Sequence, residues 1–89
     1  MSKGIVSWTK KDDEGEKIQV YAHRFGNEWT FYRRQKRYDQ WQTMKSPPLD
    51  DWMELLDGVE RRVARRLMRP EEIVRVRKLI RETFPEANV

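Results

Sequence analysis

Residues 17–34 read KIQVYAHRFGNEWTFYRR, two alternating segments joined by Gly26-Asn27. In residues 17–24 and again in residues 28–34, apolar side chains occupy every second position, as in strands with one face turned to a core. Gly26-Asn27 suits a two-residue hairpin loop whose first position needs a positive φ, which glycine adopts without strain. The stretch therefore predicts a β-hairpin.

The length of this loop fixes the register of the hairpin. Ala22 then lies opposite Phe31, and Tyr21 opposite Tyr32. A slip by one residue would mix the two faces, so their consistency favours this pairing. We call the apolar side the inner face and the other side the outer face. The inner face has Ile18, Val20, Ala22, Trp29 and Phe31, and the outer face has Tyr21, His23, Phe25, Tyr32 and Arg34.

Two further strands are expected around the hairpin. Residues 4–10 form a shorter candidate strand, joined to the hairpin through the acidic turn at residues 12–15. Residues 38–44 form the other, after a short turn near residues 35–37 that places Trp41 beside Phe31. Tyr38, Gln40 and Gln42 are then expected on the outer face.

The pattern changes to helical after Ser46-Pro47-Pro48, because two prolines cannot continue a strand. Asp50 is the expected N-cap of a first helix. A second helix is expected to start at the Arg69-Pro70 break and to run to about Phe84. The apolar stripe of the first helix has Trp52, Leu56, Val59, Val63 and Leu67, widened by Leu55, Ala64 and Met68, and that of the second has Ile73, Val76, Ile80 and Phe84, with Leu79 adjoining.

The predicted fold class is α+β, in the order β-β-β-β-α-α. An antiparallel β-meander of three to four strands (1–45) leads through a Pro-rich connection (46–48) into two α-helices (49–85) that pack on one face of the sheet. A chain of 89 residues has room for one small domain.

Composition excludes several classes of protein. There is no cysteine, so disulfides and thiolate zinc sites cannot form. The sequence has neither the apolar run of a signal peptide nor the ~20 apolar residues needed to span a bilayer. We therefore expect a cytoplasmic protein with no membrane association.

Catalysis is not expected. With His23 as the single histidine, nucleophile–base pairs and histidine-rich metal sites cannot be built within one chain. The carboxylates at residues 12–16 are interpreted as an exposed turn, and those at Asp50 and Asp51 as a helix start. We expect no enzyme activity, no metal and no cofactor, and we interpret His23 as an exposed side chain without a functional role.

The net charge of +4 is unevenly placed. Residues 1–48 carry ten Lys and Arg against six Asp and Glu, whereas residues 49–89 carry nine of each. The excess lies mainly in residues 24–45. Such a field attracts polyanions, although basic residues also serve solubility.

The outer face is the predicted functional surface. Aromatic side chains there can stack on the bases of RNA or single-stranded nucleic acid, while neighbouring cations hold phosphates. Phe25, His23, Gln40 and Gln42 complete this platform. The predicted site has Tyr21, Tyr32 and Tyr38 as stacking residues and Arg33, Arg34, Lys36 and Arg37 as phosphate-binding residues.

Two other interpretations of the same face stay open. Cross-strand tyrosine pairs stabilise a sheet without any ligand. Alternatively, the face or a free sheet edge binds a protein partner, including a second copy of the chain in a homodimer, as in a small adaptor or regulatory subunit.

The arginine-rich helices have two interpretations as well. Two helices at a tight break invite comparison with a DNA-binding helix-turn-helix, but that motif has a 3–4-residue turn and this break is Arg69-Pro70. Glu60, Glu71, Glu72 and Glu82 offer ion-pair partners at helical spacing. We expect a solvated charged face.

Overall fold

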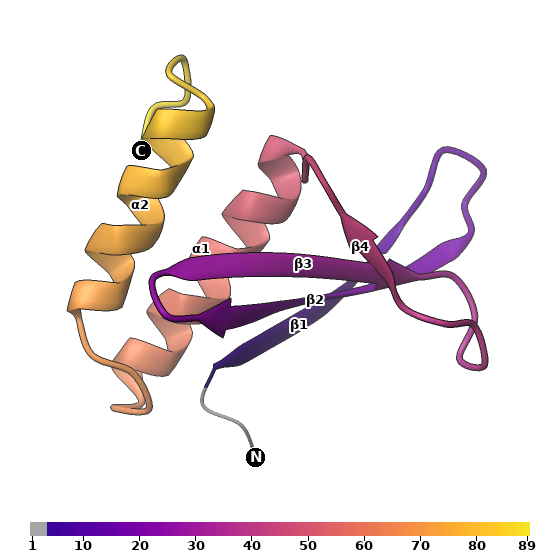
Figure 1. Ribbon diagram of the computed structural model, residues 1–89, viewed down its shortest axis with the longest axis horizontal. Coiled ribbons are helices and arrows are strands. Elements are labelled where there is room, and N and C mark those ends of the chain that lie inside the picture. The colour runs from indigo at the N-terminus through magenta and orange to yellow at the C-terminus, as the bar shows by residue number, and fades with distance from the viewer. Residues whose placement is uncertain (1–3) are drawn as a thin grey trace. The chain divides into compact units, whose positions relative to one another are not determined.

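The computed structural model describes residues 4–89 of the chain and confirms the α+β fold class (Figure 1). Four antiparallel strands come first and two helices follow. The chain divides into two compact units, of which one ends at Pro47 and the other begins at Pro48, within the predicted Pro-rich connection. Packing of the helices on a face of the sheet stays a prediction.

The first unit is one sheet in the order β1-β2-β3-β4, so each strand pairs with its neighbour in sequence. The Gly26-Asn27 turn lies at one end of the sheet, and the 12–16 turn and the 35–41 loop lie at the other (Figure 1). The strands are β1 (Ile5–Lys11), β2 (Lys17–Phe25), β3 (Glu28–Arg34) and β4 (Gln42–Met44).

The hairpin register is as predicted. Ala22 pairs with Phe31, and Tyr21 pairs with Tyr32. Gly26 has a φ of 62°, and Asn27 after it does not share this left-handed conformation. Because a side chain at Gly26 would be strained there, the glycine holds the turn that sets the register.

The inner face carries the apolar residues of the sheet, as predicted. Five predicted members of this face are at most 8% exposed: Ile18, Val20, Ala22, Trp29 and Phe31. β1 adds Val6, which is buried opposite Ala22, and Trp8, whose ring meets Phe31 edge to face at 6.0 Å between centroids.

The last strand corrects the prediction for residues 38–44. β4 has only three residues, and Met44, not Trp41, pairs with Phe31. Gln42 pairs with Arg33 and so lies on the inner face. A tight turn near residues 35–37 is replaced by a loop over residues 35–41, which shifts the alternation by one residue. The expected positions of Trp41 and Gln42 on the two faces were therefore wrong.

The second unit begins with α1 (Leu49–Ala64), which starts one residue earlier than its predicted cap. Pro48 occupies the N-cap position in an extended conformation, so Asp50 lies inside the first turn. Acidic residues in that turn favour the positive end of the helix dipole. The expectation of an Asp50 N-cap was wrong because the carbonyl of Pro48 already accepts the first helical hydrogen bonds, from the amides of Asp51 and Trp52.

The connection between the helices is longer than the predicted Arg69-Pro70 break. α1 ends at Ala64, and Arg66 has a φ of 61°. The amide of Arg66 donates to the carbonyl of Val63 at 2.9 Å, and that of Leu67 to the carbonyl of Arg62 at 2.8 Å. This pair of bonds is a Schellman motif, which caps the last carbonyls of a helix.

The second helix, α2 (Glu71–Thr83), follows Pro70 at the N-cap position and ends within one residue of the prediction. Val76 and Ile80 are fully buried, as are Leu55 and Val59 of α1. Leu67 lies beyond α1 and is 56% exposed, so the apolar stripe of that helix is shorter than predicted. Within residues 4–89, neither helix has the length and apolar character that crossing a bilayer requires.

Candidate functional site

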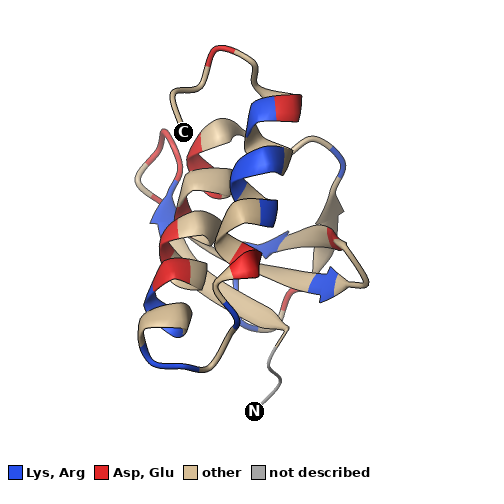
Figure 2. Cartoon of the chain, turned by 90° about the vertical axis from the view of Figure 1, so that its left-hand side faces the viewer, with Lys and Arg blue, Asp and Glu red and all other residues tan. Residues whose placement is uncertain are grey.

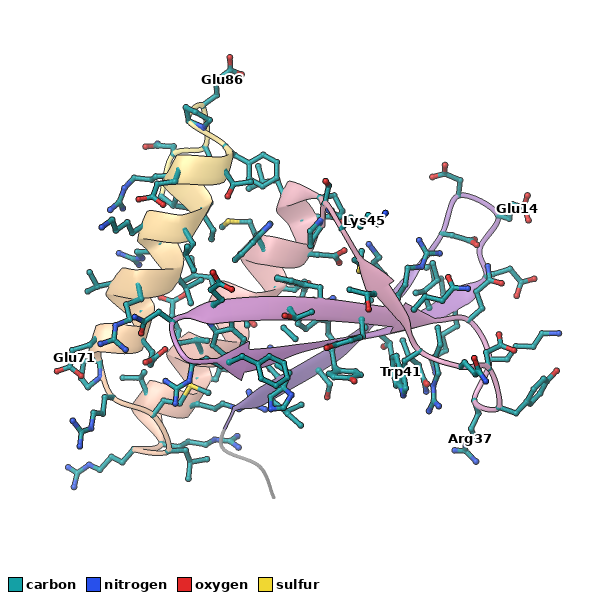
Figure 3. All side chains as sticks on the ribbon, viewed as in Figure 1. Glu14, Arg37, Trp41, Lys45, Glu71 and Glu86 are labelled. Carbon is teal, nitrogen blue, oxygen red and sulfur yellow. The ribbon has the colours of Figure 1, made fainter. Side chains whose placement is uncertain are left out.

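Three aromatic rings gather on the outer face of the sheet. The Tyr21–Tyr32 pairing across β2 and β3 stacks the two rings, with centroids 4.7 Å apart and planes 20° apart. Trp41 joins them from the 35–41 loop, edge to face with Tyr21 at 4.6 Å. Figure 3 shows Trp41 beside the strands, whereas Arg37 lies at the far end of the loop. We call Tyr21, Tyr32 and Trp41 the aromatic cluster.

Arg34 connects the Trp41 ring of this cluster to β2. Its guanidinium lies 4.3 Å from the centroid of the Trp41 ring, within range of a cation–π interaction. Its Nε donates a hydrogen bond of 2.7 Å to Oε1 of Gln19, the residue opposite it on β2. The Arg34 side chain is therefore held by two contacts, and neither of them neutralises its positive charge.

The loop after β3 is a separate structure with its own turn. The amide of Asp39 donates to the carbonyl of Lys36 at 2.9 Å, and the amide of Lys36 donates to Oδ2 of Asp39 at 3.1 Å. Tyr38 is 80% exposed in this turn, with the Lys36 ammonium 5.9 Å from its ring centroid. Tyr38 thus lies in the loop, and among the described residues it makes no ring contact with the aromatic cluster.

Two hollows flank Arg34, and both are lined by the first unit. We call the first the tryptophan hollow. It has a volume of about 390 Å³ and lies between Trp41 and β1. The second hollow has a volume of about 550 Å³ and lies between β3 and the 35–41 loop. The tryptophan hollow is lined by Ser7, Trp8, Thr9, Gln19, Val20, Arg34 and Trp41, and the second by Arg33, Arg34, Gln35, Asp39, Gln40 and Gln42.

Four of the nine basic residues in residues 49–89 form ion pairs with carboxylates of the described residues. Acidic residues lie beside the basic ones on both helices (Figure 2). Arg75 pairs with Glu72 at 2.9 Å within α2, and Arg77 of α2 reaches Glu60 of α1 at 3.5 Å. Further pairs are Arg61 with Asp57 and Lys78 with Glu82. These ion pairs agree with the expected solvated charged face.

The basic residues at the end of β3 and in the 35–41 loop form a second group. Among residues 4–89, no carboxylate lies within ion-pair distance of Arg33, Arg34, Lys36 or Arg37. The acidic turn at residues 12–16 lies at the same end of the sheet, but Asp12 binds its own backbone there, accepting from the amides of Glu14 and Glu16 at 2.9 and 2.8 Å. Residues 33–41 carry these four cations against one carboxylate, Asp39, so this segment has an excess of positive charge.

The structure brings together part of the predicted site. Tyr21, Tyr32 and Arg34 adjoin one another, as expected from the hairpin register. Arg33 pairs with Val20 and so starts from the inner face, although it lines the second hollow. The remaining predicted residues, Lys36, Arg37 and Tyr38, lie in the 35–41 loop.

Sequence reasoning missed Trp41 and Gln19 as members of this surface. Gln19 could have been found, because the predicted register already places it opposite Arg34 on the outer face. Trp41 could not, because its face depends on how many residues the preceding loop contains.

His23 and Tyr21 are titratable side chains of the outer face, and each lies against an aromatic ring. His23 lies against Phe25, with ring centroids 4.2 Å apart. Burial raises the pKa of the Tyr21 phenol above its usual value of 10.0, and the neighbouring Tyr32 adds to the shift. Both contacts strengthen the sheet and require no ligand.

The chemistry available on the outer face is stacking, hydrogen bonding and the attraction of anions. Within the described part of the chain, no three His, Cys, Asp or Glu side chains are placed to hold a metal ion. Comparison with protein-family models, curated proteins and solved structures gave no match to this chain.

Proposed function

We propose that the outer face of the sheet binds RNA or single-stranded DNA and that the protein binds without catalysing a reaction. The observation that carries the proposal is the Arg34 guanidinium against the Trp41 ring of the aromatic cluster. Three further cations without carboxylate partners among residues 4–89, Arg33, Lys36 and Arg37, lie on the same strand and in the adjoining loop. Stacking needs only the π-face that every base has, and phosphates need only accessible positive charge.

The binding mode follows from the positions of these side chains. Phosphates are held by Lys36 and Arg37 in the loop and by Arg33 at the second hollow. Bases stack against the exposed parts of Trp41 and Tyr32, each contributing about 1–3 kcal/mol. Arg34 holds the Trp41 ring in place and adds its own charge.

A salt titration with a labelled oligonucleotide tests this proposal. If three to four phosphates are neutralised, a plot of log K against log salt concentration has a slope of about −2 to −3 for a single strand. Replacing Arg33, Arg34, Lys36 and Arg37 by glutamine flattens this slope and weakens binding at low salt. Urea unfolding of the variant checks that the sheet is retained.

The matched control removes four cations from the second unit. Glutamine at Arg65, Arg69, Lys78 and Arg81 lowers the net charge by the same amount, and all four positions are exposed. This variant is expected to keep the affinity and the slope of the native chain. Equal losses in both variants mean that binding follows net charge alone, and no binding by the native chain at low salt removes the proposal.

A protein partner is the second candidate function, and the edge of the sheet favours it. β1 is an edge strand, and Gly4 and Asp12 form their ladder hydrogen bonds toward β2, to Arg24 and Glu16. By alternation, the peptide groups of Ile5, Ser7, Thr9 and Lys11 point away from β2, where another strand can pair with them. Light scattering distinguishes the two functions, because self-pairing through β1 predicts a dimer whose stability changes little with salt.

A further inference from the structure

The tryptophan hollow has the size of a small-molecule site. Its volume of about 390 Å³ falls within the range of about 300–1,000 Å³ that is usual for ligand pockets. Trp41 forms an aromatic wall, and Ser7, Thr9 and Gln19 on the outer face of β1 and β2 supply polar groups. A planar ring with a polar edge suits this lining.

The side-chain amide of Gln19 has a fixed orientation in the hollow, and the group that it offers to a ligand is a hydrogen-bond donor. A guanidinium can only donate, so the side-chain oxygen of Gln19 must face Nε of Arg34. The amide NH₂ of Gln19 is therefore turned away from Arg34 and can donate to a ligand. Arg34, which also lines the hollow, has further N–H groups and no acceptor. The hydroxyls of Ser7 and Thr9 can adapt to either role.

We infer that the tryptophan hollow receives one nucleobase and selects bases with carbonyl oxygens, which are uracil, thymine, guanine and cytosine, over adenine, which has none. Thymine and uracil present two carbonyl acceptors, and guanine presents O6 beside N7. Adenine has no carbonyl oxygen, and each acceptor on its hydrogen-bonding edges, N1 or N7, lies beside the N6 amino donor. Of the two donors at Gln19 and Arg34, the base can then satisfy only one. The inference rests on the proposed function and adds base preference to it.

Binding of three labelled eight-nucleotide DNA strands, dT8, dC8 and dA8, tests the inference with the full chain. We expect dT8 to bind roughly tenfold more tightly than dA8, the size of one bidentate base contact, with dC8 between them. The bases of an adenine strand stack on one another, and this self-stacking alone weakens the binding of dA8 relative to dT8. The deciding quantity is therefore the ratio of the dA8 and dT8 dissociation constants in a variant relative to the native chain.

The variant is Gln19→Glu, which keeps an acceptor for Arg34 but puts an oxygen where the donating NH₂ was. We expect it to lower the dA8 to dT8 ratio at least fivefold, because the donor that discriminates is gone. Gln40→Glu is the control, since it makes the same change in charge at the second hollow. Gln40→Glu should weaken the binding of dA8 and dT8 about equally and leave the ratio of their dissociation constants unchanged.

The outcomes separate the inference from the proposed function. If all three strands bind but the native chain binds them equally, or if Gln19→Glu leaves the ratio as in the native chain, the base preference is overturned and the binding surface stands. If none of the three strands binds at low salt, the proposed function fails and the inference fails with it.

Discussion

Trp41 shows how one side chain organises the outer face. Its ring meets Tyr21 on one strand and the Arg34 guanidinium on the next, and it walls the tryptophan hollow. Yet 37% of Trp41 is exposed, more than its neighbours in the sheet. A large aromatic side chain held at two points and still open to solvent is suited to stacking.

Replacing Trp41 by alanine is therefore expected to affect binding more than stability. The loss of one stacked base weakens oligonucleotide binding by roughly 5- to 150-fold. The free energy of unfolding falls by about 1–2 kcal/mol, because one edge contact and one cation–π contact are lost. Fluorescence anisotropy and urea unfolding measure the two effects.

Tyr38→Ala is the matched control, since Tyr38 makes no ring contact with the aromatic cluster in residues 4–89. We expect it to change the affinity less than threefold. A larger loss at Tyr38 than at Trp41 would place the stacking surface at the Tyr38 turn of the loop instead of at the aromatic cluster.

A pH prediction follows from Tyr21. Its pKa is raised in the folded protein, by burial and then by Tyr32, so folding favours the neutral phenol. The stabilisation is complete below about pH 10 and is lost as the pH rises through the folded pKa, because the unfolded chain ionises first. Urea unfolding between pH 8 and pH 11 should show a smaller loss of stability in Tyr21→Phe than in the native chain. The same decline in both would contradict this assignment, and Tyr38→Phe controls for the loss of a phenol.

At the scale of elements, the β2–β3 turn and the connection after α1 each use a left-handed residue, as does Gly15 in the β1–β2 turn. In the β2–β3 hairpin this residue is Gly26, for which the conformation carries no penalty. After α1 it is Arg66, for which the conformation is strained. The sequence signals the first turn and gives no sign of the second, which is why the helix connection was predicted too short.

Arg66→Gly is expected to stabilise the protein by about 1 kcal/mol, because glycine is the preferred residue at this position of a Schellman motif. Thermal unfolding should show a higher midpoint. Arg65→Gly is the control, because Arg65 has a negative φ of −92°, and there glycine is expected to destabilise the protein. A lower midpoint for Arg66→Gly would contradict the capping arrangement.

For the whole molecule, the distribution of charge distinguishes the two units. The helical unit has as many acidic as basic residues, and several form ion pairs, so the net charge of +4 comes from the sheet unit. We therefore expect a polyanion to approach the sheet unit first. Because the field acts over about 10 Å at moderate salt, it affects the first approach more than the final geometry.

NMR titration with dT8 is expected to show where the ligand lies. Amide shifts should change mainly in residues 7–9, 19–21 and 32–43, around the aromatic cluster and the loop. Residues 49–83, which form the helices, are expected to change little. The largest shifts in α1 or α2 would move the binding surface to the arginine-rich helices.

The sequence by itself determined the element types, their order and the register of the central hairpin. Periodicity and turn chemistry are local, and the Gly26-Asn27 turn forces Tyr21 beside Tyr32 as soon as the hairpin forms. The tertiary structure decided the rest of the site. The seven residues of the 35–41 loop set no register by themselves, so only folding showed that Trp41 meets Tyr21 and that Gln42 turns inward. The ion pairs of the helices divide in the same way, since Arg75 with Glu72 and Lys78 with Glu82 follow from helical spacing, whereas Arg77 with Glu60 forms only because the two helices pack together.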